Sequence, residues 1–226
     1  MGEVSSLVEF RAVMARLRAE CPWKAAQTHT SLARYLLEET HEALEALEAP
    51  DGPDLEALRE ELGDLLLQVY FHAAIAEESG AFTVEDVAAD VVAKMRRRNP
   101  HVFGAAQDGP PRDPAAVNEL WESVKATEKP RASLLDGIAP TLPALLLADK
   151  VLDRLTRAGE APESVLARAA RVPAEPTGAA GTAGAAGAAV ARDLLGVVAR
   201  ARAEGVDAEQ ALRVLARALA ASPDGP

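Results

Sequence analysis

The stretch YLLEETHEALEALE, residues 35–48, decides the fold class, because its leucines and glutamates recur with helical spacing. The pattern returns in LREELGDLLLQVYFHAA, residues 58–74, after the turn APDGPD with its two prolines and one glycine. We therefore predict two helices, at about 32–48 and 55–78, with Asp54 capping the second one. A connection this short makes the two helices antiparallel neighbours.

The rest of the chain shows helical patterns and no convincing strand. Further helices are expected at 3–20, 84–98, 115–129, 141–157 and 190–221. Thr30 or Ser31 is expected to cap the helix that starts near residue 32. Residues 173–190 are rich in Ala, Gly and Pro, which is typical of a linker. The predicted fold class is all-α.

Composition narrows the class of protein further. Of 226 residues 49% are hydrophobic but only 4% are aromatic, which favours closely packed helices with a core of Leu, Val and Ala. The single cysteine, Cys21, allows no internal disulfide and suits a reducing compartment. The N-terminal stretch is charged throughout, unlike a signal peptide, and no apolar run approaches the roughly 20 residues of a membrane span. We expect a soluble, cytoplasmic protein.

The charge balance argues against two kinds of partner. Lys and Arg number 24 against 35 Asp and Glu, for a formal net charge of −11. Such a surface repels nucleic acid and anionic membranes, and the single basic run KMRRR is too short to reverse that. Neither nucleic acid nor a membrane is expected as a partner.

Acidic residues gather at corresponding positions of the two hairpin helices. Glu39 and Glu42 are three residues apart, hence about 60° apart around the helix axis, and Glu38 lies in the same sector. Glu61 and Asp64 repeat this spacing on the second helix. We predict that these carboxylates lie along the edge of the apolar seam between the helices and that four or five of them converge. The seam itself is expected to be closed by Leu36, Ala43, Leu44, Leu47, Leu58, Leu62, Leu65 and Val69.

Converged carboxylates repel one another unless they are protonated or neutralised. A hard divalent cation such as Mg²⁺ relieves the repulsion, because it takes oxygen ligands. Either acidic pair alone is typical of a solvated helix face, whereas both together across a hairpin indicate a metal site. Lys94 and Arg98, and Trp121 and Lys125, are each one helical turn apart. Taken singly, the cations are typical of a helix C-terminus, and Trp121 is typical of a core aromatic. Beside an acidic site, the cations could instead bind a polyphosphate and the Trp121 ring could stack on a base.

Four blocks, in this order, carry a family resemblance over residues 5–130: CPWKAAQTHTSLARYLLEETHEALEAL, LREELGDLLLQVYFHAAIAEE, KMRRRNPHVFG and NELWESVKATEK. Together they resemble a MazG-type nucleoside triphosphate pyrophosphohydrolase. The resemblance implies an all-α, Mg²⁺-dependent enzyme that converts an NTP or dNTP to the monophosphate and pyrophosphate. It also implies a homodimer or larger homo-oligomer and a role in nucleotide-pool sanitation. Lys24 departs from the pattern, since the family often has Asp there.

Transferred by position, the metal-binding carboxylates of the family fall on Glu38, Glu39, Glu42, Glu61 and Asp64. Within this set we assign the roles as follows. The metal ligands are expected to be Glu39, Glu42, Glu61 and Asp64. Glu38, next to them, is the expected catalytic base, which takes a proton from the attacking water. The substrate-binding residues are expected to be Lys94, Arg98, Trp121 and Lys125, of which the three cations offset charge on the leaving group.

The resemblance also divides the chain. Residues 1–130 are expected to form the MazG-like domain, and 131–226 a decayed second helical repeat. Asp193 of that part lacks the glutamate three residues earlier, where Val190 stands. The alternative function is a non-catalytic helical interaction module or a nucleotide-sensing regulator, neither of which needs the acidic residues intact. A ferritin-like di-iron site is excluded, because only Glu38 begins a Glu-x-x-His pair.

Overall fold

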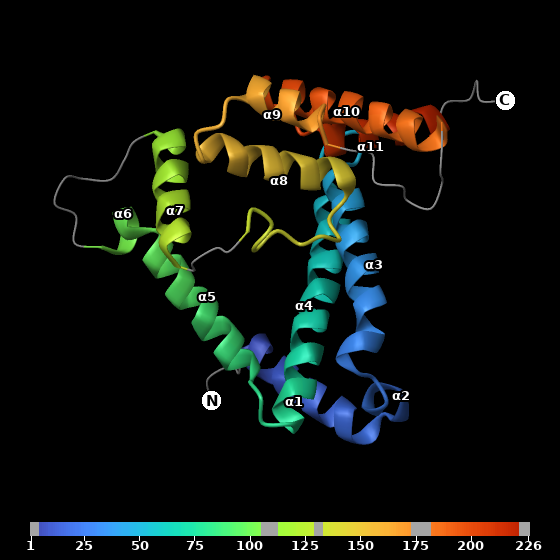
Figure 1. The fold of residues 1–226 in the computed structure, drawn as a ribbon. Helices are drawn as coiled ribbons and strands as arrows, with labels where there is room; N and C mark the ends of the chain where they lie inside the picture. The colour runs from blue at the N-terminus through green and yellow to red at the C-terminus, as the bar shows by residue number, and fades with distance from the viewer. Residues whose placement is uncertain (1–4, 105–112, 129–132, 173–181, 222–226) are drawn as a thin grey trace. The chain divides into compact units, whose positions relative to one another are not determined.

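The computed structural model describes residues 5–104, 113–128, 133–172 and 182–221, which form helices and no strand (Figure 1). The predicted all-α class is therefore confirmed for the described residues. The helices are α1 (Ser6–Glu20), α2 (Pro22–Ala25), α3 (His29–Leu47), α4 (Leu55–Glu78), α5 (Val84–Arg98), α6 (Pro100–Phe103), α7 (Pro114–Glu128), α8 (Ala144–Arg157), α9 (Pro162–Ala169), α10 (Thr182–Ala203) and α11 (Ala208–Ala221). They belong to two compact units, Met1–Glu128 and Lys129–Pro226.

The hairpin of α3 and α4 is the centre of the first unit (Figure 1). Asp54 caps α4 as predicted, since its Oδ1 accepts hydrogen bonds from the backbone N–H of Glu56 and Ala57, both at 3.1 Å. The predicted cap of α3 is wrong by two or three residues. Thr28 is the cap, because Thr28 and Ser31 exchange backbone and hydroxyl hydrogen bonds of 3.1 and 2.9 Å in a capping box.

Helix α1 closes the core of the first unit over the hairpin. Met14, Leu32, Tyr70 and Phe71 are buried together, so α1, α3 and α4 each contribute to this core. The rings of Phe10 and Tyr70 lie 4.7 Å apart, and the Tyr70 hydroxyl donates to the Leu7 carbonyl at 3.1 Å. This packing holds α3 and α4 in register, and hence the acidic residues that they carry.

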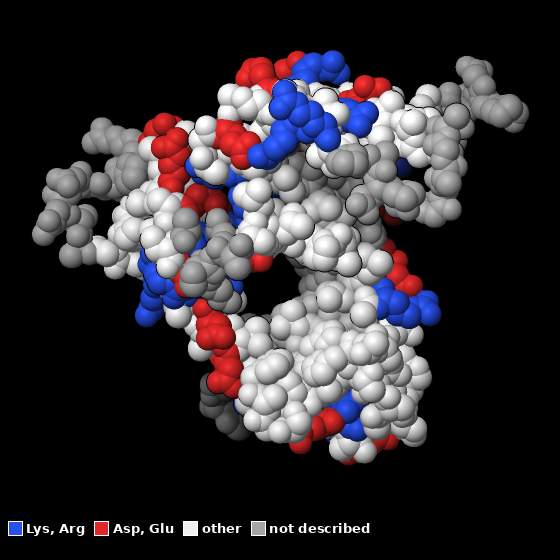
Figure 2. All heavy atoms as spheres, viewed as in Figure 1, with Lys and Arg blue, Asp and Glu red and all other residues white. Residues whose placement is uncertain are grey.

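The apolar seam of the hairpin is only partly closed within one chain. Ala43 is buried and Leu44, Leu58 and Leu65 are half-buried. The prediction is wrong for the other four positions, Leu36, Leu47, Leu62 and Val69, which stay exposed. Two helices cannot cover each other's full apolar stripe when that stripe is wider than their line of contact. Figure 2 shows few charged atoms over the part of this hairpin that faces the viewer.

Helix α5 follows α4 after a turn in which Gly80 has φ +68°, in agreement with the predicted end of α4 at this glycine. A capping box of Thr83 and Asp86 starts α5, which packs against α4 and α7. The helix ends at Arg98, ahead of Pro100. Pro100 then occupies the first turn of the short helix α6, where its missing N–H costs nothing.

The second unit consists of α8 to α11 around a core of Leu152, Leu155, Val165 and Val198. Residues 190–221, predicted to be helical, belong to the two helices α10 and α11, which are separated at Gly205 with φ +71°. Helix α9 was not expected, because eight residues are too few for a clear periodic pattern.

The predicted linker at 173–190 is also wrong in part. Helix α10 begins at Thr182, so residues 182–190 are helical; residues 173–181 lie outside the described ranges. The high helix propensity of alanine offsets Gly184 and Gly187 there. None of the helices in the described ranges is both long and apolar enough to cross a membrane.

Candidate functional site

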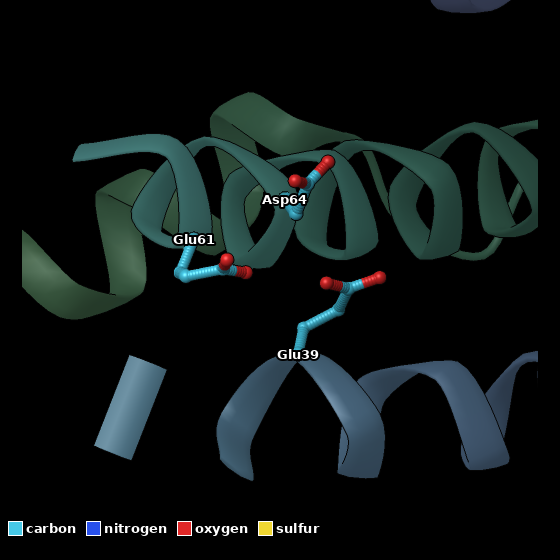
Figure 3. A group of neighbouring side chains, drawn as sticks. All are labelled: Glu39, Glu61 and Asp64. Carbon is cyan, nitrogen blue, oxygen red and sulfur yellow. The ribbon is translucent and has the colours of Figure 1, made fainter. Parts of the chain in front are cut away.

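Three carboxylates of the α3–α4 hairpin face one another (Figure 3). Glu39 comes from α3, and Glu61 and Asp64 come from α4. Each contributes one oxygen to a group whose members all lie within 4.8 Å of one another, and all three residues are half-buried. The spacing of three residues puts Glu61 and Asp64 on one side of α4, and the antiparallel neighbour brings Glu39 opposite them.

Glu42, one turn after Glu39, lies near this group, and we call the four residues Glu39, Glu42, Glu61 and Asp64 the acidic cluster. Burial raises the pKa of Glu39 most, and the negative charges of Asp64, Glu42 and Glu61 raise it further. Burial likewise raises the pKa of Glu61, followed by the charges of Glu42 and Asp64. Within the described ranges no lysine or arginine forms an ion pair with any of the four carboxylates. The cluster therefore lacks positive charge.

The donor set of the acidic cluster fits a hard divalent cation. Oxygens that share one Mg²⁺ lie ~3–4 Å apart, given Mg–O distances of ~2.1 Å. The oxygens of Glu39, Glu61 and Asp64, all within 4.8 Å of one another, are close to that range. Three of the four predicted ligands, Glu39, Glu61 and Asp64, are thus found together, and Glu42 lies near enough to raise the pKa of Glu39 and Glu61. The binding of metal by these residues stays a prediction.

Glu38 does not join the acidic cluster, so of the four or five carboxylates expected to converge this one does not. Its Oε1 accepts a hydrogen bond from Arg34 Nη2 at 3.1 Å, and its side chain is exposed. Consecutive helical residues point about 100° apart, so Glu38 faces away when Glu39 faces α4.

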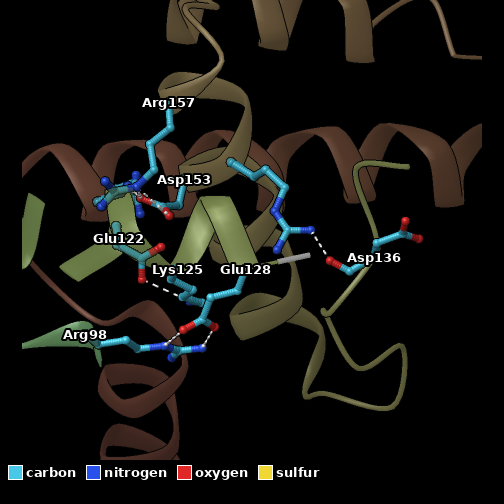
Figure 4. Close-up of polar contacts among 9 residues, drawn as sticks. Arg98, Glu122, Lys125, Glu128, Asp136, Asp153 and Arg157 are labelled. Carbon is cyan, nitrogen blue, oxygen red and sulfur yellow. Dashed lines mark hydrogen bonds and ion pairs between the residues drawn. The ribbon is translucent and has the colours of Figure 1, made fainter. Parts of the chain in front are cut away.

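The four predicted substrate-binding residues lie on α5 and α7. Three of them meet in what we call the Trp121 cluster, which comprises Arg98, Trp121, Glu122, Lys125 and Glu128. Figure 4 shows the pairs that Arg98 forms with Glu128 and Lys125 forms with Glu122. The guanidinium carbon of Arg98 lies 4.7 Å from the centroid of the Trp121 ring, and Lys125 Nζ lies 4.8 Å from it. Both distances are those of cation–π contacts. Lys94, one turn before Arg98, forms no ion pair within the described residues.

The cations of the Trp121 cluster are already paired. Glu128 accepts hydrogen bonds from Arg98 Nε at 3.1 Å and Nη2 at 2.6 Å, while Lys125 Nζ donates to Glu122 Oε1 at 2.9 Å. The side chains of Arg98 and Glu128 are only 13% and 15% exposed. Arg98, with a smaller contribution from Arg97, lowers the pKa of Glu128 to about 2.

Sequence reasoning missed the two carboxylates of this cluster. A signal for one of them was present, because Trp121, Lys125 and Glu128 have the spacing i, i+4, i+7 of a single helix face. The acidic cluster lies on α3 and α4, and the Trp121 cluster on α5 and α7. Within the described residues no hydrogen bond, ion pair or ring contact connects one cluster to the other.

The fold and the acidic cluster define an all-α protein with a carboxylate centre suited to a divalent cation. Residues 27–103 match the MazG nucleotide pyrophosphohydrolase domain, a range that contains the whole acidic cluster. The chain belongs to the MazG family.

Several relatives extend this match beyond the domain. A nucleoside triphosphate pyrophosphohydrolase of Mycobacterium tuberculosis is 46% identical over 155 residues, which are 68% of this chain and 46% of the relative. One of Escherichia coli K12 is 42% identical over 165 residues, 70% of this chain and 59% of the relative. An uncharacterized 26.1 kDa protein of Streptomyces cacaoi is 40% identical over 215 residues, 93% of this chain and 78% of that protein. The chain thus spans about half the length of the two named pyrophosphohydrolases.

Proposed function

We propose that this protein hydrolyses nucleoside triphosphates to the monophosphate and pyrophosphate at the acidic cluster. The observation that carries the proposal is the group of carboxylate oxygens of Glu39, Glu61 and Asp64 within 4.8 Å of one another, with which no lysine or arginine of the described residues forms an ion pair. Membership of the MazG family and the names of the two relatives support the reaction. The activity belongs with nucleotide-pool sanitation, in which unwanted triphosphates are removed by breaking the bond between the α- and β-phosphates.

In this proposal Glu39, Glu42, Glu61 and Asp64 hold Mg²⁺. When bound there, Mg²⁺ would supply Lewis-acid chemistry, which offsets phosphate charge and favours deprotonation of the attacking water. Glu38 is our candidate for the base that accepts the water's proton. Because Glu38 accepts a hydrogen bond from Arg34, its carboxylate has to leave Arg34 before it can accept the proton of the water.

Lys94, Arg98 and Lys125 serve the phosphate side of the reaction, where they offset the charge that builds up on the leaving pyrophosphate. Trp121 offers a flat ring on which the base can stack. The nucleotide would link the two clusters, because its phosphates attract both the cation and these side chains.

We also propose that a second copy of the chain covers the exposed face of the hairpin. Leu55, Leu62 and Val69 follow one another at intervals of seven residues along α4 and are all exposed. Leu62→Glu should therefore convert a homodimer to monomers in sedimentation velocity. Leu212→Glu is the matched control, since Leu62 and Leu212 are each 53% exposed and Leu212 belongs to the second unit. A dimer unaffected by Leu62→Glu would place the interface elsewhere.

A product assay over a panel of NTPs and dNTPs with Mg²⁺ tests the reaction. We expect one pyrophosphate and one monophosphate per turnover, without orthophosphate. Release of orthophosphate would contradict the proposal. Tight nucleotide binding with no turnover would instead favour the nucleotide-sensing regulator.

A further inference from the structure

Arg98 uses only one edge of its guanidinium group to hold Glu128. The two bonds come from Nε at 3.1 Å and Nη2 at 2.6 Å, which is the side-on fork of a bidentate pair. A guanidinium has five N–H donors, so three remain on Nη1 and Nη2 along its other edge. Within the described residues these three donors form no hydrogen bond.

Glu128 is in turn held from a second side. Arg97 Nε donates to Glu128 Oε1 at 2.8 Å, so two arginines of α5 fix one carboxylate of α7. The pair of Arg98 and Glu128 is largely buried, whereas Arg97 is half-exposed. Since the pKa of Glu128 is about 2, the carboxylate stays charged at any pH at which the protein would work.

Positive charge remains after this pairing. Arg97, Arg98 and Lys125 face the two carboxylates Glu122 and Glu128, and Lys94 adds an unpaired cation one turn before Arg98. The region is therefore still attractive to an anion.

We propose that Glu128 is a positioning residue, which holds the Arg98 guanidinium against Trp121 so that its free edge is presented to the phosphates of the nucleotide. This inference rests on the proposed function. A flexible arginine loses rotamer freedom when it binds phosphate, and a preformed ion pair removes that freedom beforehand. The opposite possibility is a latch, in which Glu128 competes with phosphate for Arg98.

The two possibilities predict opposite effects of the same substitution. Glu128→Gln in the full chain keeps the shape of the side chain but removes its charge. If Glu128 positions Arg98, this variant should raise KM for the preferred NTP by about tenfold with kcat changed less than about twofold, because a charge-assisted bond that orients a ligand contact is lost. Glu128→Asp should recover part of the loss. Glu119→Gln is the matched control, an exposed carboxylate of the same helix.

Equilibrium binding separates this inference from the proposed function. Calorimetric titration of pyrophosphate into wild type and Glu128→Gln should show about tenfold weaker binding by the variant at equal folded fraction. Equal or tighter binding by the variant would overturn the inference, and so would a lower melting temperature with unchanged KM. Binding by wild type without any turnover would overturn only the proposed function. No binding by wild type would overturn both.

Discussion

The two clusters of the first unit differ in how their carboxylates are compensated by positive charge. In the acidic cluster burial and like charges raise the pKa of Glu39 and Glu61, and no cation of the described residues pairs with them. In the Trp121 cluster opposite charges lower the pKa of Glu128 to about 2, and the ion pairs are complete. The first cluster carries repulsion that a bound cation would relieve, whereas the second is already compensated. This difference supports the proposal that a divalent cation binds between α3 and α4.

The largest effect is expected from neutralising the acidic cluster. Glu39→Gln should lower kcat at least ~100-fold, since metal-assisted charge stabilisation is worth several kcal/mol and each ~1.4 kcal/mol is a factor of ten. Helical circular dichroism should stay near that of wild type. Glu45→Gln, an exposed position on the same helix, should have no effect. Near-normal turnover by Glu39→Gln at saturating Mg²⁺ would show that the acidic cluster takes no part in catalysis.

A smaller effect should follow from Lys125→Ala. The loss of one charge-assisted contact to phosphate should reduce kcat/KM by about tenfold. Mg²⁺ should stabilise this variant as much as wild type in thermal melts, because an ammonium group cannot ligate a cation. A lost Mg²⁺ response would show that the two clusters do not act as separately as the contacts suggest.

The sequence predicted the acidic cluster better than the Trp121 cluster. Spacing of three residues on each of two antiparallel helices suffices to bring Glu39 to Glu61 and Asp64, because helix geometry alone determines which side chains share a face. The expectation that Glu38 joins the acidic cluster is wrong, because consecutive residues of a helix point about 100° apart. The spacing puts Glu128 on the helix face of Trp121 and Lys125, but its pairing with Arg98 could not be predicted, since α5 and α7 meet only through tertiary packing.

The same reason explains the other misses. Alanine-rich residues 182–190 lack the apolar periodicity that reveals a packed helix, although their propensity is helical. The exposed leucines of α4, such as Leu62, follow the apolar pattern correctly. Whether these leucines are buried depends on contacts outside the hairpin, which the apolar pattern of one chain does not specify.

The two clusters should contribute to stability with opposite pH dependence, which should appear as a change of a few degrees in melting temperature. The pKa values of Glu39 and Glu61 are raised above the ordinary 4.5, so the folded state binds protons more tightly than the unfolded state. The stability of the metal-free protein therefore falls as the pH rises through 4.5 and then through the raised pKa values of the folded state. The Mg²⁺-induced increase in melting temperature should therefore grow from about pH 4.5 to 7. A Mg²⁺ effect that is constant over this range would contradict the assignment.

Glu128 should behave in the opposite sense. Its pKa in the folded state, about 2, lies below the ordinary 4.5, so its contribution is complete above 4.5 and is lost as pH falls towards 2. Acid unfolding of wild type should accordingly have a component that Glu128→Gln lacks. Identical acid transitions for the two proteins would show that the pair with Arg98 adds nothing to stability.

The smallest effect is expected from removing the second unit. Both clusters lie within Met1–Glu128, which has its own core of Met14, Leu32, Tyr70 and Phe71. A chain ending at Arg131 should keep activity per folded site within about twofold of the full chain, because no residue of the proposed site is removed. Metal binding without turnover by the soluble shortened chain would mean that the second unit completes the site.

Calorimetric titration with Mg²⁺ tests the central claim most directly, because it requires no knowledge of the substrate. Wild type, Glu39→Gln and Glu122→Gln should be compared at pH 7. The acidic cluster predicts saturable binding by wild type and Glu122→Gln, and its loss in Glu39→Gln. Equal Mg²⁺ binding by wild type and Glu39→Gln would contradict the claim that these unpaired carboxylates form the metal centre.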